Sequence, residues 1–262
     1  MEVIGYLAAI LIGLILGLLG GGGSILSIPI LVYIFQIDAV TASAYSLFIV
    51  GVTSFVGAIP KYKEHLVNIR TGLLFGIPSI ISIFATRKWI IPAIPDVILH
   101  TESFIITKRI LILGLFALLM ILTSISMIRN KKELQNKDNR FRTFWVVLEG
   151  IIIGFLTGLV GAGGGFLIIP ALVLLTGLPF KTAVGTSLFI IAINSLIGFL
   201  GDVFNYAMDW KFLLMITALA VIGILIGNFT SKKISSLKLR KSFGWFVLLM
   251  GTWILIRELA LT

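Results

Sequence analysis

Residues 17–29 read GLLGGGGSILSIP, and residues 158–170 read GLVGAGGGFLIIP. The offset between matched positions is 141 (170 − 29), and it holds without a gap from residue 17 to residue 57, over which 18 of 41 positions are identical to their counterparts. Apolar helices resemble one another in composition, but composition does not match glycines, prolines and serines at one offset. The sequence therefore predicts a true internal duplication.

Composition places this duplication in a membrane. The 262 residues are 58% hydrophobic and 12% charged, with a mean hydropathy of +1.13, whereas soluble domains carry about 25% charged residues. Because backbone groups in lipid must be paired within their own segment, we expect an all-α polytopic membrane protein. A spanning helix needs about 20 mainly apolar residues, and the long candidates are 3–19, 42–59, 70–86, 109–128, 144–160, 183–200, 211–229 and 242–260.

The duplication divides the chain into two repeats. Residues 1–128 form repeat 1, residues 129–142 a basic cytoplasmic linker with six Lys or Arg, and residues 143–262 repeat 2. Two short apolar segments, 24–36 and 165–177, directly follow the glycine clusters. Each repeat is therefore expected to contain a Gly-rich helical hairpin followed by three transmembrane helices.

Charge at matched loops predicts that the two repeats have inverted topology. Short loops rich in Lys and Arg stay in the cytoplasm, which applies to 61–70, 129–142 and 231–241. The counterpart of 61–70 instead carries Asp202 and Asp209. Opposite charge preference at matched loops is what an inverted repeat requires. We expect 61–70 inside and 201–210 outside, with 87–108 an irregular outer loop.

The two glycine clusters are the candidate substrate site. Consecutive glycines weaken a helix and leave backbone N–H groups free, and within a membrane such groups are tolerated only inside protein or along a cavity. Each cluster also precedes a helix N-terminus, which binds an anion without a lysine. The alternative is close helix packing, which we favour for the ordinary spacings Gly13-xxx-Gly17, Gly154-xxx-Gly158 and Gly223-xxx-Gly227.

Hydroxyl and amide side chains of the following helices could add donors to an anion. Bonding between or within helices is the alternative for each of them, and Asn194 is the strongest candidate because a deep amide needs a partner. The candidate substrate-binding residues are Gly20, Gly21, Gly22, Gly23, Ser24, Ser46, Gly161, Gly163, Gly164, Gly165, Thr186, Ser187 and Asn194.

Several function classes are disfavoured by what the sequence lacks. The chain contains no cysteine, so disulfides and thiolate chemistry are unavailable. It has no GxxxxGK[ST], HExxH or GxSxG motif, so we expect no enzyme activity, no cofactor and no metal. The net charge of +10 clusters at helix ends, where topology requires it, so nucleic acid is not an expected partner.

Four motifs carry a family resemblance: GLLGGGGSILSIPIL (17–31), TASAYSLF (41–48), GLVGAGGGFLIIPAL (158–172) and TAVGTSLF (182–189). At these motifs the sequence resembles the sulfite exporter TauE/SafE family of membrane transporters. It departs from the pattern at Ser24, opposite Gly165, and at Ala44-Tyr45, opposite Gly185-Thr186. The resemblance implies movement of small sulfur-containing anions such as sulfite, sulfoacetate or other organosulfonates.

The residues alone indicate an inverted-repeat secondary transporter for an anion. With the resemblance, we expect alternating-access transport of a sulfur anion by a multi-pass protein of a prokaryotic plasma membrane. The expected partners are a small anionic substrate, the lipid bilayer and a second copy in a homodimer. Two alternatives stay open: a passive anion channel, and a membrane sensor or assembly subunit without flux.

Overall fold

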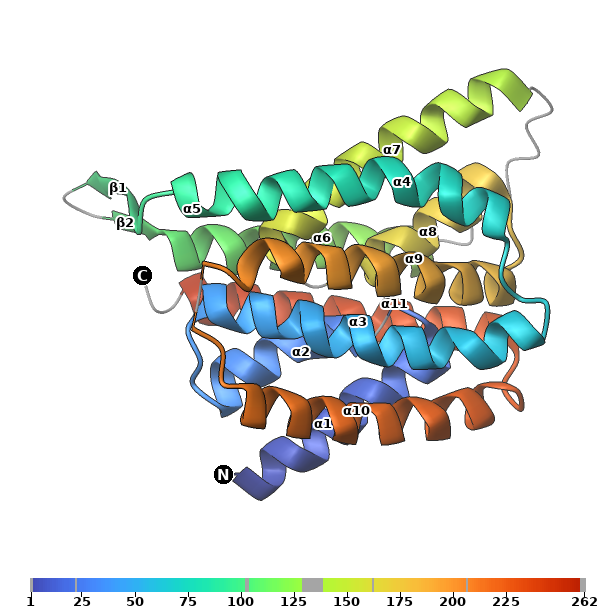
Figure 1. Cartoon of the computed structure of the whole chain (residues 1–262), viewed down its shortest axis with the longest axis horizontal. Helices are drawn as coiled ribbons and strands as arrows, with labels where there is room; N and C mark the ends of the chain where they lie inside the picture. Colours follow the sequence, from blue (N-terminus) through green and yellow to red (C-terminus); the bar gives the residue numbers. More distant parts are fainter. Residues whose placement is uncertain are drawn as a thin grey trace.

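The computed structural model is a bundle of long helices (Figure 1) and describes residues 2–21, 23–101, 104–128, 139–161, 163–205 and 207–259. Every predicted apolar segment is helical, which confirms the all-α polytopic class. Five helices in the described ranges are long and apolar enough to cross a membrane. The first half contains α1 (Glu2–Leu19), α2 (Gly23–Pro29) with the π-helix η1 (Ile30–Ile34), α3 (Ala39–Lys63), α4 (Ile69–Ala85) and α6 (Lys108–Ile128). The second half contains α7 (Asn139–Val160), α8 (Gly165–Thr176), α9 (Phe180–Asp202), α10 (Trp210–Ser231) and α11 (Ser236–Leu259).

Polar caps fix where the membrane helices begin. The Asp38 carboxylate accepts the Val40 N–H at 2.9 Å before α3, and the Asp209 carboxylate accepts the Phe212 N–H at 3.1 Å before α10. The Asn68 side chain accepts the Thr71 N–H at 3.0 Å before α4. Such caps satisfy N–H groups that lack an intrahelical acceptor and each contributes about 1 kcal/mol.

Matched helices of the two halves run in opposite directions. At one end of the bundle, the last turns of α3 and α10 meet through Lys61 and Ser231. At the other end, Tyr45 in the second turn of α3 contacts Asp209, which precedes α10, and Arg87 beyond α4 contacts Asp202, the last residue of α9. We name these the lysine end and the arginine end. The inverted orientation in a membrane stays a prediction.

Packing between the halves has a matching pattern. Helix α1 packs along α10 and its counterpart α7 packs along α4, the counterpart of α10. Helices α3 and α9 pack against each other, as do α6 and α11. Exchanging the two halves therefore turns the α1–α10 contact into the α7–α4 contact and leaves the α3–α9 and α6–α11 contacts unchanged. All four contacts join the halves, so the core lies between them.

The ordinary glycine spacings serve close packing, as the sequence predicts. A Cβ atom on Gly13 would lie 1.8 Å from the carbonyl oxygen of Ala220, and one on Gly223 would lie 2.0 Å from that of Ile10. A Cβ on Gly154 would lie 2.5 Å from the carbonyl oxygen of Ser79. Helices α1 and α10, and helices α7 and α4, thus approach at backbone distance, which only small residues permit.

The prediction of an irregular outer loop over 87–108 is wrong. After α4 the chain continues helically through the π-helix η2 (Thr86–Ile90) and α5 (Ile91–Ala93), then forms an antiparallel hairpin of β1 (Val97–Thr101) and β2 (Phe104–Thr107). Arg87 is therefore part of a long helix, and it is fully buried. In the predicted linker, residues 139–142 belong to α7, and residues 129–138 lie outside the described ranges.

Candidate functional site

Both glycine clusters form sharp helix ends of the same geometry. Gly20 has φ +76° and donates its N–H to the Leu16 carbonyl at 2.8 Å; its counterpart Gly161 has φ +83° and donates to the Thr157 carbonyl at 2.7 Å. Residues other than glycine rarely adopt this left-handed conformation. The duplicated glycines therefore end α1 and α7 and reverse the chain into the short helices α2 and α8.

The two hairpin tips meet inside the bundle. A Cβ on Gly21 would lie 2.0 Å from the carbonyl carbon of Gly165, and a Cβ on Gly165 would lie 2.3 Å from the Cα of Gly21. The two backbones are thus in direct contact, and both residues are buried. In Figure 1 the α1–α2 hairpin enters from the end with the chain termini, and the α7–α8 hairpin enters from the opposite end. Gly22, a predicted site residue, lies outside the described residues.

Each tip rests on a long helix of the other half. A Cβ on Gly20 would lie 2.9 Å from Val184 and 3.1 Å from the Ser187 hydroxyl, both on α9. A Cβ on Gly161 would lie 2.4 Å from the Cβ of Ser43, the counterpart of Val184 on α3. The site is therefore assembled across the halves.

Buried donors surround the N-terminus of α8. The Leu167 and Ile168 N–H groups both bond to the Gly164 carbonyl at 2.9 Å, and Gly164 supplies no side-chain cap. The amides of Gly165 and Phe166 precede these bonds and are the first donors of the helix. A Cβ on Gly163 (φ +66°) would lie 2.8 Å from the Ser195 hydroxyl, and one on Gly164 (φ +69°) 2.2 Å from the Thr157 hydroxyl.

The hydroxyls of Ser195 and Thr157 are buried, and neither has a hydrogen-bond partner within the described ranges. The same holds for Thr53, Ser54 and the Asn194 side-chain oxygen. Buried polar atoms are normally hydrogen-bonded, so a group of buried atoms without partners indicates a bound ligand or water. Thr53 and Ser54 are the counterparts of Asn194 and Ser195 at the offset of 141. The duplication thus repeats these polar positions in both halves.

The predicted polar site residues divide into two groups. Ser24 and Ser187 lie at the α1–α2 tip and donate to the carbonyls of Gly21 and Val184 at 2.7 and 2.8 Å, whereas the Ser46 hydroxyl pairs with that of Ser27 in α2 at 2.5 Å. Thr186 accepts the Asn68 N–H at 2.9 Å, in the loop before α4. The Asn194 amide donates to the Ser79 hydroxyl at 2.6 Å.

At the arginine end a buried ion pair covers the tip of the α7–α8 hairpin, at Gly161 (the second tip). Arg87 lies 2.9 Å from the Asp202 carboxylate and donates to the Ser43 hydroxyl at 2.9 Å. The side chains of Arg87 and Asp202 are both 0% exposed. A Cβ on Gly161 would lie 2.1 Å from the guanidinium, so this pair closes the space directly beyond the tip.

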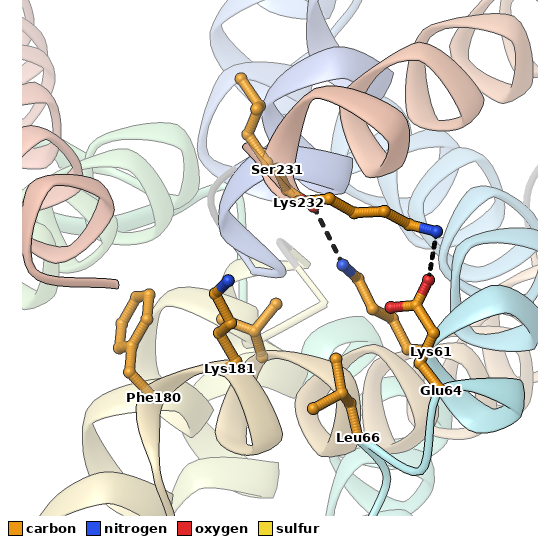
Figure 2. Close-up of a pocket in the computed structure, with 9 residues that line it drawn as sticks. Lys61, Glu64, Leu66, Phe180, Lys181, Ser231 and Lys232 are labelled. Carbon is orange, nitrogen blue, oxygen red and sulfur yellow. Dashed lines mark hydrogen bonds and ion pairs between the residues drawn. The ribbon is translucent and has the colours of Figure 1, made fainter. Parts of the chain in front are cut away.

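At the lysine end a cavity of about 120 Å³ (Figure 2) adjoins the tip of the α1–α2 hairpin, at Gly20 (the first tip). Val184 borders both this cavity and Gly20. The sequence pattern assigned Lys61 and its neighbours to topology alone, left Ser195 out of the candidate residues although its helix was considered, and did not indicate Thr157, Arg87 or Asp202 as groups near the site. The offset of 141 was the available signal, since it pairs Lys61 with Asp202 and Ser54 with Ser195.

Comparison with known proteins gives one family. The sequence model of the family described as "Sulfite exporter TauE/SafE" matches residues 5–254. A "Probable membrane transporter protein" of Xylella fastidiosa is 26% identical over 257 residues, which cover 95% of this chain and 93% of the relative. The "Probable membrane transporter protein YunE" of Bacillus subtilis is 28% identical over 260 residues, covering 88% and 90%. A probable membrane transporter protein of Methanocaldococcus jannaschii is 27% identical over 267 residues, covering 94% of each chain. No solved structure matches the chain.

Proposed function

Because the chain belongs to the sulfite exporter TauE/SafE family, whose matched relatives are named membrane transporters, we propose that it moves a small sulfur-containing anion across the membrane by alternating access. Sulfite, sulfoacetate and other organosulfonates are the substrates that we expect. The family match makes the chain a multi-pass membrane transporter, and the apolar helices agree with this assignment. The anion and the mechanism are our proposal.

The observation that carries the proposal is the meeting of the two tips beside unpaired hydroxyls. Helix N-termini bind anions through free N–H groups and the positive end of the helix dipole. At α8 that end is accompanied by the buried Ser195 and Thr157 hydroxyls, which have no partner in the described ranges. A sulfur oxyanion has several acceptor oxygens and no hydrogen to donate, so it matches a site made of N–H and O–H donors.

The proposed mechanism draws support from the difference between the two ends. Beyond Gly161 the path is closed by Arg87 and Asp202, whereas beyond Gly20 there is a cavity. A transporter built from two repeats holds its substrate between them and opens to one side at a time. Movement of one half against the other would separate Arg87 from Asp202 and close the cavity at the lysine end.

Uptake into liposomes tests the proposed function. The purified protein is reconstituted, and entry of radiolabelled sulfite and sulfoacetate is measured with and without unlabelled anion inside. Alternating access predicts saturable uptake that the internal anion accelerates. Uptake that rises linearly with concentration, without acceleration, would indicate the passive channel, and the absence of any flux would favour the sensor or assembly subunit.

A pair of variants connects the flux to the site. Thr157→Val combined with Ser195→Ala removes two unpaired hydroxyls, each a potential bond to an anion of about 1.5–3 kcal/mol. Since 1.4 kcal/mol is tenfold in affinity, the apparent affinity for sulfite should fall by about tenfold or more. Thr217→Val is the matched control, because that buried hydroxyl donates to the Leu213 carbonyl of its own helix. Equal uptake by the double variant and the control would remove these hydroxyls from the mechanism.

A further inference from the structure

We propose that the cavity at the lysine end is a second anion-binding site, which takes one small inorganic oxyanion such as sulfite or sulfate. Its walls come from five segments: the last turn of α1, the last turn of α3, the loop before α4, the first turns of α9 and the end of α10. The lining residues are Leu18, Lys61, Glu64, Leu66, Phe180, Lys181, Val184, Ser231 and Lys232. This site is separate from the donors around Gly163 and Gly164, and it does not depend on the flux proposed above.

The size of the cavity suits a small oxyanion. Its volume is about 120 Å³, and one water needs roughly 10–15 Å³ of such space. A tetrahedral or pyramidal oxyanion with a few waters therefore fits, whereas a large organic anion does not.

The charge around the cavity is positive and incompletely paired. Three lysines face one carboxylate, Glu64, which already lies 2.6 Å from the Lys232 ammonium. In the part of the chain that the structure describes, Lys61 and Lys181 have no carboxylate within 4.0 Å. Two positive charges thus remain beside the cavity, and a bound anion would complete the pairing.

Lys61 shows most clearly that a counter-charge is missing. Only 6% of Lys61 is exposed, and its ammonium donates to the Ser231 hydroxyl at 3.0 Å. Lysines are almost never this buried without an opposite charge, because removing an ammonium from water is costly. The Ser231 hydroxyl in turn donates to the Asn228 carbonyl at 2.8 Å, so it offers the ammonium a lone pair but no charge.

The dipole of α9 does not explain why a lysine stands at position 181. Lysines near the ends of α3 and α10 are favoured there by the negative end of the helix dipole, but Lys181 is the second residue of α9, where a cation is unfavourable. Figure 2 shows its side chain rising from α9 into the same space as that of Lys61. An anion between them would interact with both ammonium groups and with the N-terminus of α9.

The position of the cavity gives the second site a role in access to the first. Val184 lines the cavity and would lie 2.9 Å from a Cβ on Gly20, and Leu18 lines it two residues before that glycine. An anion held by Lys61 and Lys181 therefore stands directly outside the first tip. The site would concentrate anions at the mouth of the path.

Isothermal titration of the purified full-length protein with sodium sulfite, in detergent at low ionic strength, tests the proposal. The wild type should bind two equivalents. Lys181→Gln should lose one equivalent or weaken it more than tenfold, and Lys181→Arg, which keeps the charge, should restore it. Lys233→Gln is the matched control, because that exposed lysine lies over Phe229 and outside the cavity.

The central site provides the second arm of the experiment. Thr157→Val with Ser195→Ala should keep the equivalent that Lys181→Gln loses. A wild type that binds no sulfite, or a Lys181→Gln variant with unchanged stoichiometry and affinity, would overturn the second site. A wild type that binds one equivalent supports the second site if Lys181→Gln abolishes that equivalent, and overturns it if Lys181→Gln keeps it. If Lys181→Gln loses an equivalent while no variant transports sulfite, the second site stands and the proposed transport fails, so the two results are distinguishable.

Discussion

Lys61 and Asp202 occupy matched positions in the two halves, 141 residues apart (202 − 61), yet they have opposite charge and opposite surroundings. Lys61 borders the cavity at the lysine end, and Asp202 is fully buried against Arg87 at the arginine end. The counterpart of Arg87 is Asn228 (228 − 87 = 141), which lies near Lys61 and donates to the Gly57 carbonyl at 3.0 Å. The duplicated scaffold thus carries an ion pair at one end and, at the other, a lysine that has no carboxylate partner among the described residues.

The buried ion pair predicts a large difference between single and double replacements. Arg87→Met or Asp202→Leu alone leaves an uncompensated buried charge and should destabilise the protein by about 3–5 kcal/mol, while the double replacement should recover most of this loss. Thermal unfolding in detergent measures both. Glu64→Gln, which breaks the partly exposed pair with Lys232, is the control and should cost about 0–1 kcal/mol. Additive effects of the two single changes would show that the pair is not coupled.

The contact between α1 and α10 predicts that one glycine tolerates no side chain while another does. Gly223→Ala places a methyl group 2.0 Å from the Ile10 carbonyl oxygen, so the free energy of unfolding should fall by about 1–3 kcal/mol. Gly76→Ala on α4 has no atom within 4 Å of its new methyl group and should be neutral or stabilising by up to about 1 kcal/mol. Thermal unfolding of both variants makes the comparison, and equal stability would contradict the close approach of the helices.

The meeting of the tips predicts a loss of uptake from a single methyl group. Gly21→Ala would bring its Cβ to 2.0 Å from the Gly165 carbonyl carbon, so the tips must separate and the donors of α8 must shift. Sulfite uptake into liposomes should fall more than tenfold. Gly114→Ala on α6, which has no atom within 4 Å, should retain it. Both variants are first checked for a single monodisperse species, and full uptake by Gly21→Ala would show that the contact is not needed for transport.

The inverted orientation predicts labelling from opposite sides of the membrane. The chain has no cysteine, so single cysteines can be placed at exposed positions without further change. Phe204→Cys at the arginine end, where the side chain is 87% exposed, should react with a membrane-impermeant maleimide on intact cells. Lys63→Cys at the lysine end should react only after the cells are opened. Reaction of both on intact cells would contradict the inverted repeat.

The helices and the tips could be predicted because their signals are local. Apolar runs of about 20 residues mark the long helices, and the glycines matched at one offset mark the chain reversals at Gly20 and Gly161. The sequence could not predict which hydroxyls lack a hydrogen-bond partner among the described residues. Ser187 and Ser24 bond to carbonyls three residues earlier, whereas Ser195 and Thr157 do not, and the sequence contains no sign of this difference.

The two ends of the bundle were not predictable because their partners are distant in the chain. Arg87 follows an apolar segment and precedes Pro92 and Pro95, which is typical of a loop. Its burial depends on Asp202, 115 residues later (202 − 87), and on Ser43. Lys61 and Lys181 are likewise indistinguishable in sequence from lysines that set topology.

The contact of Gly21 with Gly165 has a consequence for motion. Ordinary packed helices resist sliding because the side-chain ridges of one helix sit in the grooves of the other. Two bare backbones have no such ridges, and no rotamer has to change when one turns on the other. The tips themselves would therefore offer little steric resistance to a small rotation, and the resistance to relative movement of the two halves lies in the contacts of α1 with α10, α4 with α7 and α3 with α9.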